Sequence, residues 1–124
     1  MSADNESQFV FFQADDGALR VNVRLEDETV WLTQAAMAEL FDCTSDNVSL
    51  HLKGIYETGE LQKEATVEDF SVVRQEGSRE VSRLIKYYNL DAIIAVGYRV
   101  NSKRATQFRI WATSVLKKNR RRSR

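Results

Sequence analysis

Proline is absent from this chain of 124 residues, and cysteine and histidine occur once each, as Cys43 and His51. A single cysteine excludes an internal disulfide, and one thiol with one imidazole cannot form a zinc site of the usual kind. A triad based on histidine would have to use His51, which we expect to be a packing or surface residue. The five glycines are isolated and form no phosphate-binding loop. With no carboxylate spacing that singles out an acid–base pair, we predict no enzymatic activity, no cofactor and no metal.

The sequence also lacks the apolar run of about 18 residues that a membrane-spanning helix needs. Its first residues, MSADNESQ, are polar and acidic, unlike a secretory signal. We therefore expect a cytoplasmic protein with no membrane partner. Without a Pro/Ser-rich linker or an internal repeat, we predict one domain over residues 1–116. Residues 117–124 are densely basic and are predicted to be a disordered tail, either a solvated end or a functional arm.

Each half of the chain is poor in charge of one sign. Residues 1–70 contain 4 Lys and Arg against 15 Asp and Glu, a net charge of −11, and residues 71–124 contain 14 against 3, a net charge of +11. The formal net charge of zero is therefore a cancellation. A strongly basic half indicates a polyanionic partner, and nucleic acid is the first candidate.

The first third of the chain predicts a small β element followed by two helices. Apolar and aromatic runs predict strands at 8–13 and 29–32, and the alternation of apolar and polar residues predicts a strand at 21–25, with turn signals between them. Thr33 and Ser45 are suitable N-caps for two short helices, the second over residues 45–56 with Val48, Leu52 and Ile55 on its inner side. Two short helices joined by a three-residue turn are typical of a helix-turn-helix.

The rest of the chain predicts a hairpin and two further helices. Residues 57–66 are interpreted as a linker, and residues 69–74 and 80–87 as strands around a turn with Gly77. Asn89 and Ser102 are suitable N-caps for two C-terminal helices. The predicted fold class is α+β: an N-terminal β element, a helix-turn-helix pair, a β-hairpin wing and two C-terminal helices, a winged-helix-like order.

Two groups of residues are suited to contact double-stranded DNA. On the helix at 45–56, polar side chains outside the apolar stripe can reach base edges or phosphates: Ser45, Asn47, Ser49 and Lys53. In the basic half, cations can hold phosphates: Arg99, Lys103, Arg104 and Arg109. Solvated polar faces on ordinary amphipathic helices explain the same residues, and Asp46 would repel DNA. Most of the aromatic side chains of the C-terminal half are predicted to be core rather than base-stacking residues: Tyr87, Tyr88, Tyr98, Phe108 and Trp111.

Three long motifs occur in one order: VWLTQAAMAELF at Val30–Phe41, NVSLHLKGIYETGEL at Asn47–Leu61 and YYNLDAIIAVGYRVNSKRATQFRIWAT at Tyr87–Thr113. With these motifs the chain resembles the virulence protein RhuM family of bacterial and prophage-borne proteins over about Arg20–Leu116. The end FRIWA is also similar, more weakly, to phage antirepressor Bro-type domains. The resemblance implies a DNA-binding-like N-terminal module, often followed by a further C-terminal region or a Fic/Doc-type domain. We expect such a region where this chain has its basic terminus, so the chain resembles a truncated gene or an excised domain.

We thus expect a DNA-binding module, a transcriptional or prophage-type regulator, with the helix at 45–56 in the major groove and the basic C-terminal helix on phosphates. The alternative is a protein–protein interaction or oligomerisation module. In that case the acidic surface of one copy would meet the basic surface of a second copy, as a homodimer, or of a partner protein.

Overall fold

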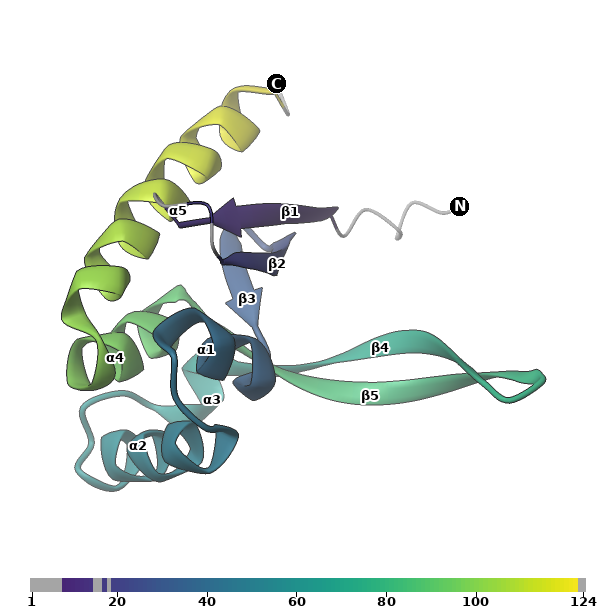
Figure 1. The fold of residues 1–124 in the computed structure, drawn as a ribbon, viewed down its shortest axis with the longest axis horizontal. Coiled ribbons are helices and arrows are strands. Elements are labelled where there is room, and N and C mark those ends of the chain that lie inside the picture. Colours follow the sequence, from purple (N-terminus) through teal and green to yellow (C-terminus); the bar gives the residue numbers. More distant parts are fainter. Residues whose placement is uncertain (1–7, 15–16, 18, 123–124) are drawn as a thin grey trace.

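The computed structural model describes residues 8–14, 17 and 19–122 (Figure 1). Within these residues the fold is α+β, with five antiparallel strands and five helices, which confirms the predicted class. The elements in chain order are β1 (Gln8–Gln13), β2 (Arg20–Glu26), β3 (Thr29–Leu32), α1 (Gln34–Phe41), α2 (Ser45–Glu57), α3 (Lys63–Thr66), β4 (Val67–Glu76), β5 (Arg79–Asn89), α4 (Leu90–Val100) and α5 (Ser102–Arg122).

The strand order is β1-β2-β3-β5-β4, so the sheet consists of an N-terminal meander and a later hairpin. The two parts are joined only where Trp31 lies opposite Asn89 and Leu32 opposite Tyr88. Beyond that joint β4 and β5 pair along their whole length, up to Glu76 opposite Arg79. As a result the hairpin projects away from the rest of the molecule (Figure 1).

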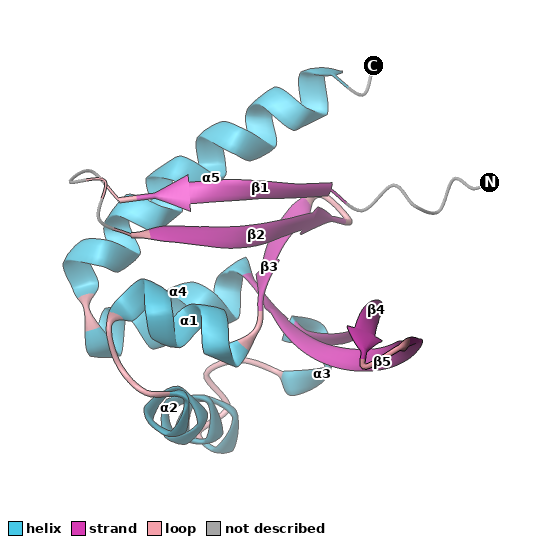
Figure 2. Ribbon diagram, turned by 45° about the vertical axis from the view of Figure 1, so that its right-hand side comes forward, coloured by secondary structure: helices cyan, strands magenta, loops and turns pink. Residues whose placement is uncertain are grey.

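The core lies between the meander and the helices. Helix α5 crosses β1 obliquely (Figure 2), and Phe12 of β1 meets the rings of Phe108 and Trp111 edge-on, each at 5.3 Å between centroids. The predicted inner stripe of α2, Val48, Leu52 and Ile55, is buried as expected. Phe108 and Tyr88 are also buried, so these two aromatic side chains belong to the core as predicted.

Side-chain caps begin α1, α2, α4 and α5, and two of the four predicted caps are confirmed. Thr33 accepts a hydrogen bond from the Ala36 N–H, and Asn89 accepts one from the Ala92 N–H. The prediction of Ser45 as a cap was wrong, because Thr44 has the extended backbone and accepts from the Asn47 N–H at 3.1 Å. The prediction of Ser102 was wrong in the same way. Asn101 accepts from the Arg104 N–H at 3.1 Å, so in both helices the capping residue lies one position before the predicted one.

The predicted linker at 57–66 is only partly a loop. Helix α2 continues to Glu57, and residues 63–66 form the short helix α3. The Thr66 hydroxyl donates back to the Gln62 carbonyl and contacts the Tyr56 hydroxyl at 2.8 Å, which ties α3 to α2. Sequence periodicity misses this helix because a single turn has no repeating pattern.

Helix α5 extends through Arg122, so the basic segment that we predicted to be a disordered tail is helical over its described part. Residues 123 and 124 lie outside the described residues, as do Asp15 and Asp16 of the predicted first turn. No helix in the described part of the chain combines the length and the apolar character needed to span a membrane.

Helices α1, α4 and α5 approach one another closely at Gly97. A Cβ atom at Gly97 would lie 2.5 Å from Phe41 Cζ and 2.7 Å from Ala105 Cβ, both inside the core. We expect Gly97→Ala to lower the free energy of unfolding by about 1–3 kcal/mol through overpacking. Urea denaturation followed by circular dichroism measures this change.

Gly54→Ala is the matched control. Gly54 is also in a helix, but a Cβ atom there has no atom within 4 Å. This substitution should raise the free energy of unfolding by up to about 1 kcal/mol, because alanine favours a helix. Equal effects of the two substitutions would contradict the close packing at Gly97.

Candidate nucleic-acid interface

The outward face of α2 presents three of the four side chains predicted to reach bases. Ser45, Ser49 and Lys53 are exposed, and their spacing of four residues places them in a row beside the buried stripe. Leu50 lies among them and is 68% exposed, and a leucine there can contact a thymine methyl group. Leu50 is not among the predicted base-reading residues, although its position outside the apolar stripe is a signal for it. This face can therefore offer hydroxyls, one cation and one apolar group.

Asn47, the fourth predicted reader of bases, is half-buried and is engaged within the molecule. Its side chain hydrogen-bonds the Cys43 thiol in the turn between α1 and α2. Burial raises the pKa of Cys43, and the bond to Asn47 lowers it by less. Asn47 thus helps to hold the inter-helix turn.

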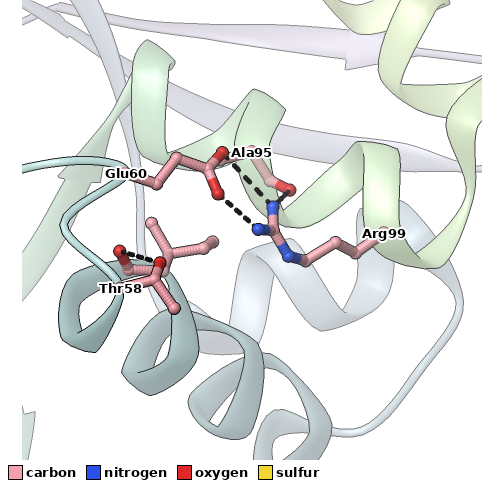
Figure 3. A network of polar contacts seen from close by, with 5 residues as sticks. Thr58, Glu60, Ala95 and Arg99 are labelled. Atoms are coloured by element: carbon pink, nitrogen blue, oxygen red, sulfur yellow. Dashed lines mark hydrogen bonds and ion pairs between the residues drawn. The ribbon is translucent and has the colours of Figure 1, made fainter.

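Arg99, on α4, contacts the loop that follows α2 (Figure 3). Its two terminal nitrogens contact the two carboxylate oxygens of Glu60, and Nη1 also donates to the Ala95 carbonyl at 2.9 Å. In the same loop the Thr58 hydroxyl donates to the Ile55 carbonyl at 3.2 Å. Arg99 is exposed, but its guanidinium joins the basic half of the chain to the acidic half.

Arg104, near the start of α5, reaches back to α1. Its Nη1 donates to the Leu40 carbonyl at 2.9 Å, in the last turn of α1. A cation at that position compensates carbonyl groups that have no partner within the helix. Of the four cations predicted to hold phosphates, Arg99 and Arg104 therefore bind a carboxylate or a backbone carbonyl of a distant segment.

The remaining two predicted cations are exposed on α5, and the helix carries further cations beyond them. The exposed lysines and arginine whose side chains are described form what we call the α5 basic face: Lys103, Arg109, Lys117 and Lys118. Arg109 Nε donates to the Tyr98 hydroxyl at 3.4 Å, and this bond is the main cause that lowers the pKa of Tyr98. Lys117 and Lys118 fall within the predicted tail. The helical spacing of Trp111, Val115 and Leu116 was the signal that α5 continues.

The structure does not bring the two predicted groups into one patch. Helix α4 packs against both α2 and α5, and α2 lies at the opposite end of the molecule from the C-terminal part of α5 (Figures 1 and 2). Lys103, Arg104 and Arg109 are on α5, whereas Arg99 alone of the predicted cations lies beside the end of α2. A ligand that contacts both groups has to extend along the molecule.

A hollow of about 240 Å³ lies elsewhere, between the meander, α1 and β5. Its lining includes Phe9, Asn22, Glu39 and Tyr87. Neither the outward face of α2 nor the α5 basic face contributes to it. Within the described residues, no group of three or more His, Cys, Asp or Glu side chains could hold a metal ion.

The internal contact of Arg104 gives a prediction. Arg104→Ala should lower the free energy of unfolding by about 1–2 kcal/mol, because the last turn of α1 loses a charged donor. Lys103→Ala removes the same charge from the exposed neighbouring position and should leave stability within about 0.5 kcal/mol of the original. Urea denaturation of both variants measures the difference. Equal stability of the two variants would mean that the contact of Arg104 with the Leu40 carbonyl does not stabilise the fold.

Comparison with known proteins finds a family match for the second half of the chain. No curated protein and no solved structure matches the chain. A family model described as "Virulence protein RhuM family" matches residues 65–123, from the end of α3 through the hairpin and α4 into α5. The resemblance predicted from sequence motifs is confirmed over that range, and residues 20–64 lie outside it. Over residues 65–123 the chain matches the virulence protein RhuM family.

Proposed function

We propose that this protein is a DNA-binding module in which the α5 basic face holds the phosphate backbone. The observation that carries the proposal is the exposure of Lys103, Arg109, Lys117 and Lys118 on a single helix of 21 residues. Cations that neutralise phosphates release counterions, which supplies affinity for any sequence. A regulator of transcription, of the prophage type, is the role that such a module would serve.

The outward face of α2 is the candidate for reading bases within this proposal. Helix α1, the turn at 42–44 and α2 have the order of a helix-turn-helix, whose second helix enters the major groove. Acidic residues flank this face, with Asp46 and Glu57 on α2. Affinity must therefore come mainly from α5, while Ser49 supplies specificity and Lys53 contacts phosphates beside the groove.

The β4–β5 hairpin is a poor candidate for a DNA-contacting wing. Its strands carry Arg74, Arg79, Arg83 and Lys86 against Glu68, Asp69, Glu76 and Glu80, a balance of charges. Arg83 contacts the Glu76 carboxylate at 2.7 Å, and Lys86 contacts Asp69 at 3.5 Å. In our proposal the winged-helix order is retained, but the hairpin does not hold phosphates.

The alternative, an interaction module that pairs acidic with basic surfaces, has less support. Two ion pairs, Arg99–Glu60 and Lys86–Asp69, already join the two halves within one chain. Those contacts use part of the charge that the alternative would offer to a partner. The salt dependence of DNA binding separates the two functions.

Removal of two cations from α5 tests the phosphate contacts. The double variant Lys117→Gln/Lys118→Gln should bind duplex DNA more weakly, and the slope of log affinity against log salt should fall by about 2. Fluorescence anisotropy titrations of a labelled duplex at several salt concentrations measure both quantities. All duplex sequences should be affected alike, because phosphates carry no sequence information.

The control is Lys63→Gln/Lys86→Gln, which removes the same charge from α3 and the hairpin. Its affinity and slope should remain close to those of the unchanged protein. If the two double variants weaken binding equally, α5 is not the contact surface. Absence of duplex binding by the unchanged protein at low salt would refute the proposal as a whole.

Substitutions on α2 test base reading. Ser49→Ala should reduce the preference for one base pair, a contact worth about 1–3 kcal/mol in specific complexes. Lys53→Ala should instead weaken binding to all sequences. Selection from a random-sequence duplex pool, followed by affinity measurements on the selected sites, distinguishes the two effects. If both variants select the same sequences as the unchanged protein and bind them with the same affinity, α2 does not enter the groove.

A further inference from the structure

The outer part of the β4–β5 hairpin exposes apolar side chains without a covering layer. Val73 is 65% exposed and Leu84 is 72% exposed, and the two lie diagonally on one face of the hairpin. A two-stranded ribbon alone in water is marginally stable, so a projecting hairpin gains from a further strand. Strand β4 is the last in the sheet order, and its outer edge therefore offers backbone donors and acceptors (Figure 1).

Two opposite charges on β4 are placed symmetrically about Ser71. The strand carries four charged residues, of which Asp69 and Glu76 are paired with Lys86 and Arg83 of β5. The other two, Glu68 and Arg74, are exposed and opposite in sign. They lie three positions before and three positions after Ser71 and point to the same side of the sheet, since both have even numbers.

From this pattern we propose that two copies of the chain pair their β4 edges antiparallel, about a two-fold axis at Ser71. In that register Glu68 of each copy lies opposite the partner's Arg74, so the dimer contains two cross-strand ion pairs. Opposite charges in directly opposed positions stabilise an antiparallel pair. The interface is isologous, as in most homodimers.

The same register also arranges the apolar side chains. Phe70 lies opposite the partner's Val72 on the side that carries the ion pairs. On the other side Leu84 is opposite Ser71 within its own hairpin, so the two copies of Leu84 flank the axis. Val73 of each copy lies two positions from the axis. The exposed apolar residues of two hairpins thus form one patch on a four-stranded sheet.

The other open edges do not specify such a register. Strand β1 is also an edge, but Gln8–Gln13 carries no charged residue that would fix an alignment. The outer part of β5 carries Arg79, Arg83 and Lys86 against Glu80, so self-pairing brings like charges together. A second copy on β4 is therefore the occupant that the charges favour.

Charge reversal at β4 tests the dimer in the absence of DNA. Sedimentation velocity of the full chain over a concentration series should show a monomer–dimer equilibrium. E68K and R74E should each weaken dimerisation at least about tenfold. In a dimer of either variant, position 68 of each copy carries the same charge as position 74 of the other copy, so both cross-strand pairs become repulsive. E80K is the control: it makes the same change of charge as E68K on β5 and should leave the dimer unchanged.

Mixing supplies the decisive measurement. In an equimolar mixture of E68K and R74E, position 68 of the first variant faces position 74 of the second, with opposite charges, and the unchanged Arg74 and Glu68 also meet. The mixture should recover dimers to within about threefold of the original dissociation constant, and the double variant E68K/R74E should do the same. Failure of both to recover, or a purely monomeric unchanged protein, would overturn the proposal. Because DNA is absent, this result is independent of the proposed DNA binding.

Discussion

Helices α1, α4 and α5 meet at Gly97, where only a hydrogen atom fits between Phe41 and Ala105. This close packing sets the position of α4, and α4 in turn separates α2 from α5. It also brings Arg99 to Glu60 and Arg104 to the Leu40 carbonyl. The surface left for a partner is therefore decided by the packing of the helices. Two cations that look available in the sequence serve to connect helices in the fold.

The opposed net charges of the two halves acquire a different meaning in the structure. Part of the opposition is used internally, in the ion pairs Arg99–Glu60 and Lys86–Asp69. Exposed pairs of this kind contribute little to stability, about 0–1 kcal/mol each, but they orient the loop after α2 and the base of the hairpin. The basic charge that stays exposed is concentrated along α5, which is why the proposed phosphate contacts lie there.

The hairpin is the part of the fold whose role differs most from the sequence interpretation. A hairpin after a helix pair suggests a DNA-contacting wing, yet the charges on β4 and β5 balance. The joint with β3 involves only Trp31 and Leu32, so the outer hairpin lacks a third strand. An open strand edge with exposed apolar residues is better suited to a protein partner than to phosphates. The proposed DNA contacts on α5 and the proposed pairing through β4 use separate surfaces, so the two proposals are compatible in one molecule.

The sequence by itself determined the elements: the strands, the helix pair, the Thr33 and Asn89 caps and the inner stripe of α2 all follow from local periodicity and capping. It also determined the likeness of residues 65–123 to the RhuM family. Tertiary structure alone decided which cations are engaged, because Arg104 and Leu40 are 64 positions apart and no local pattern joins them. It likewise decided that Asn47 turns toward Cys43 and that β4 has an open edge. These outcomes depend on packing between distant segments, whereas the periodicity of a sequence reports only neighbours along the chain.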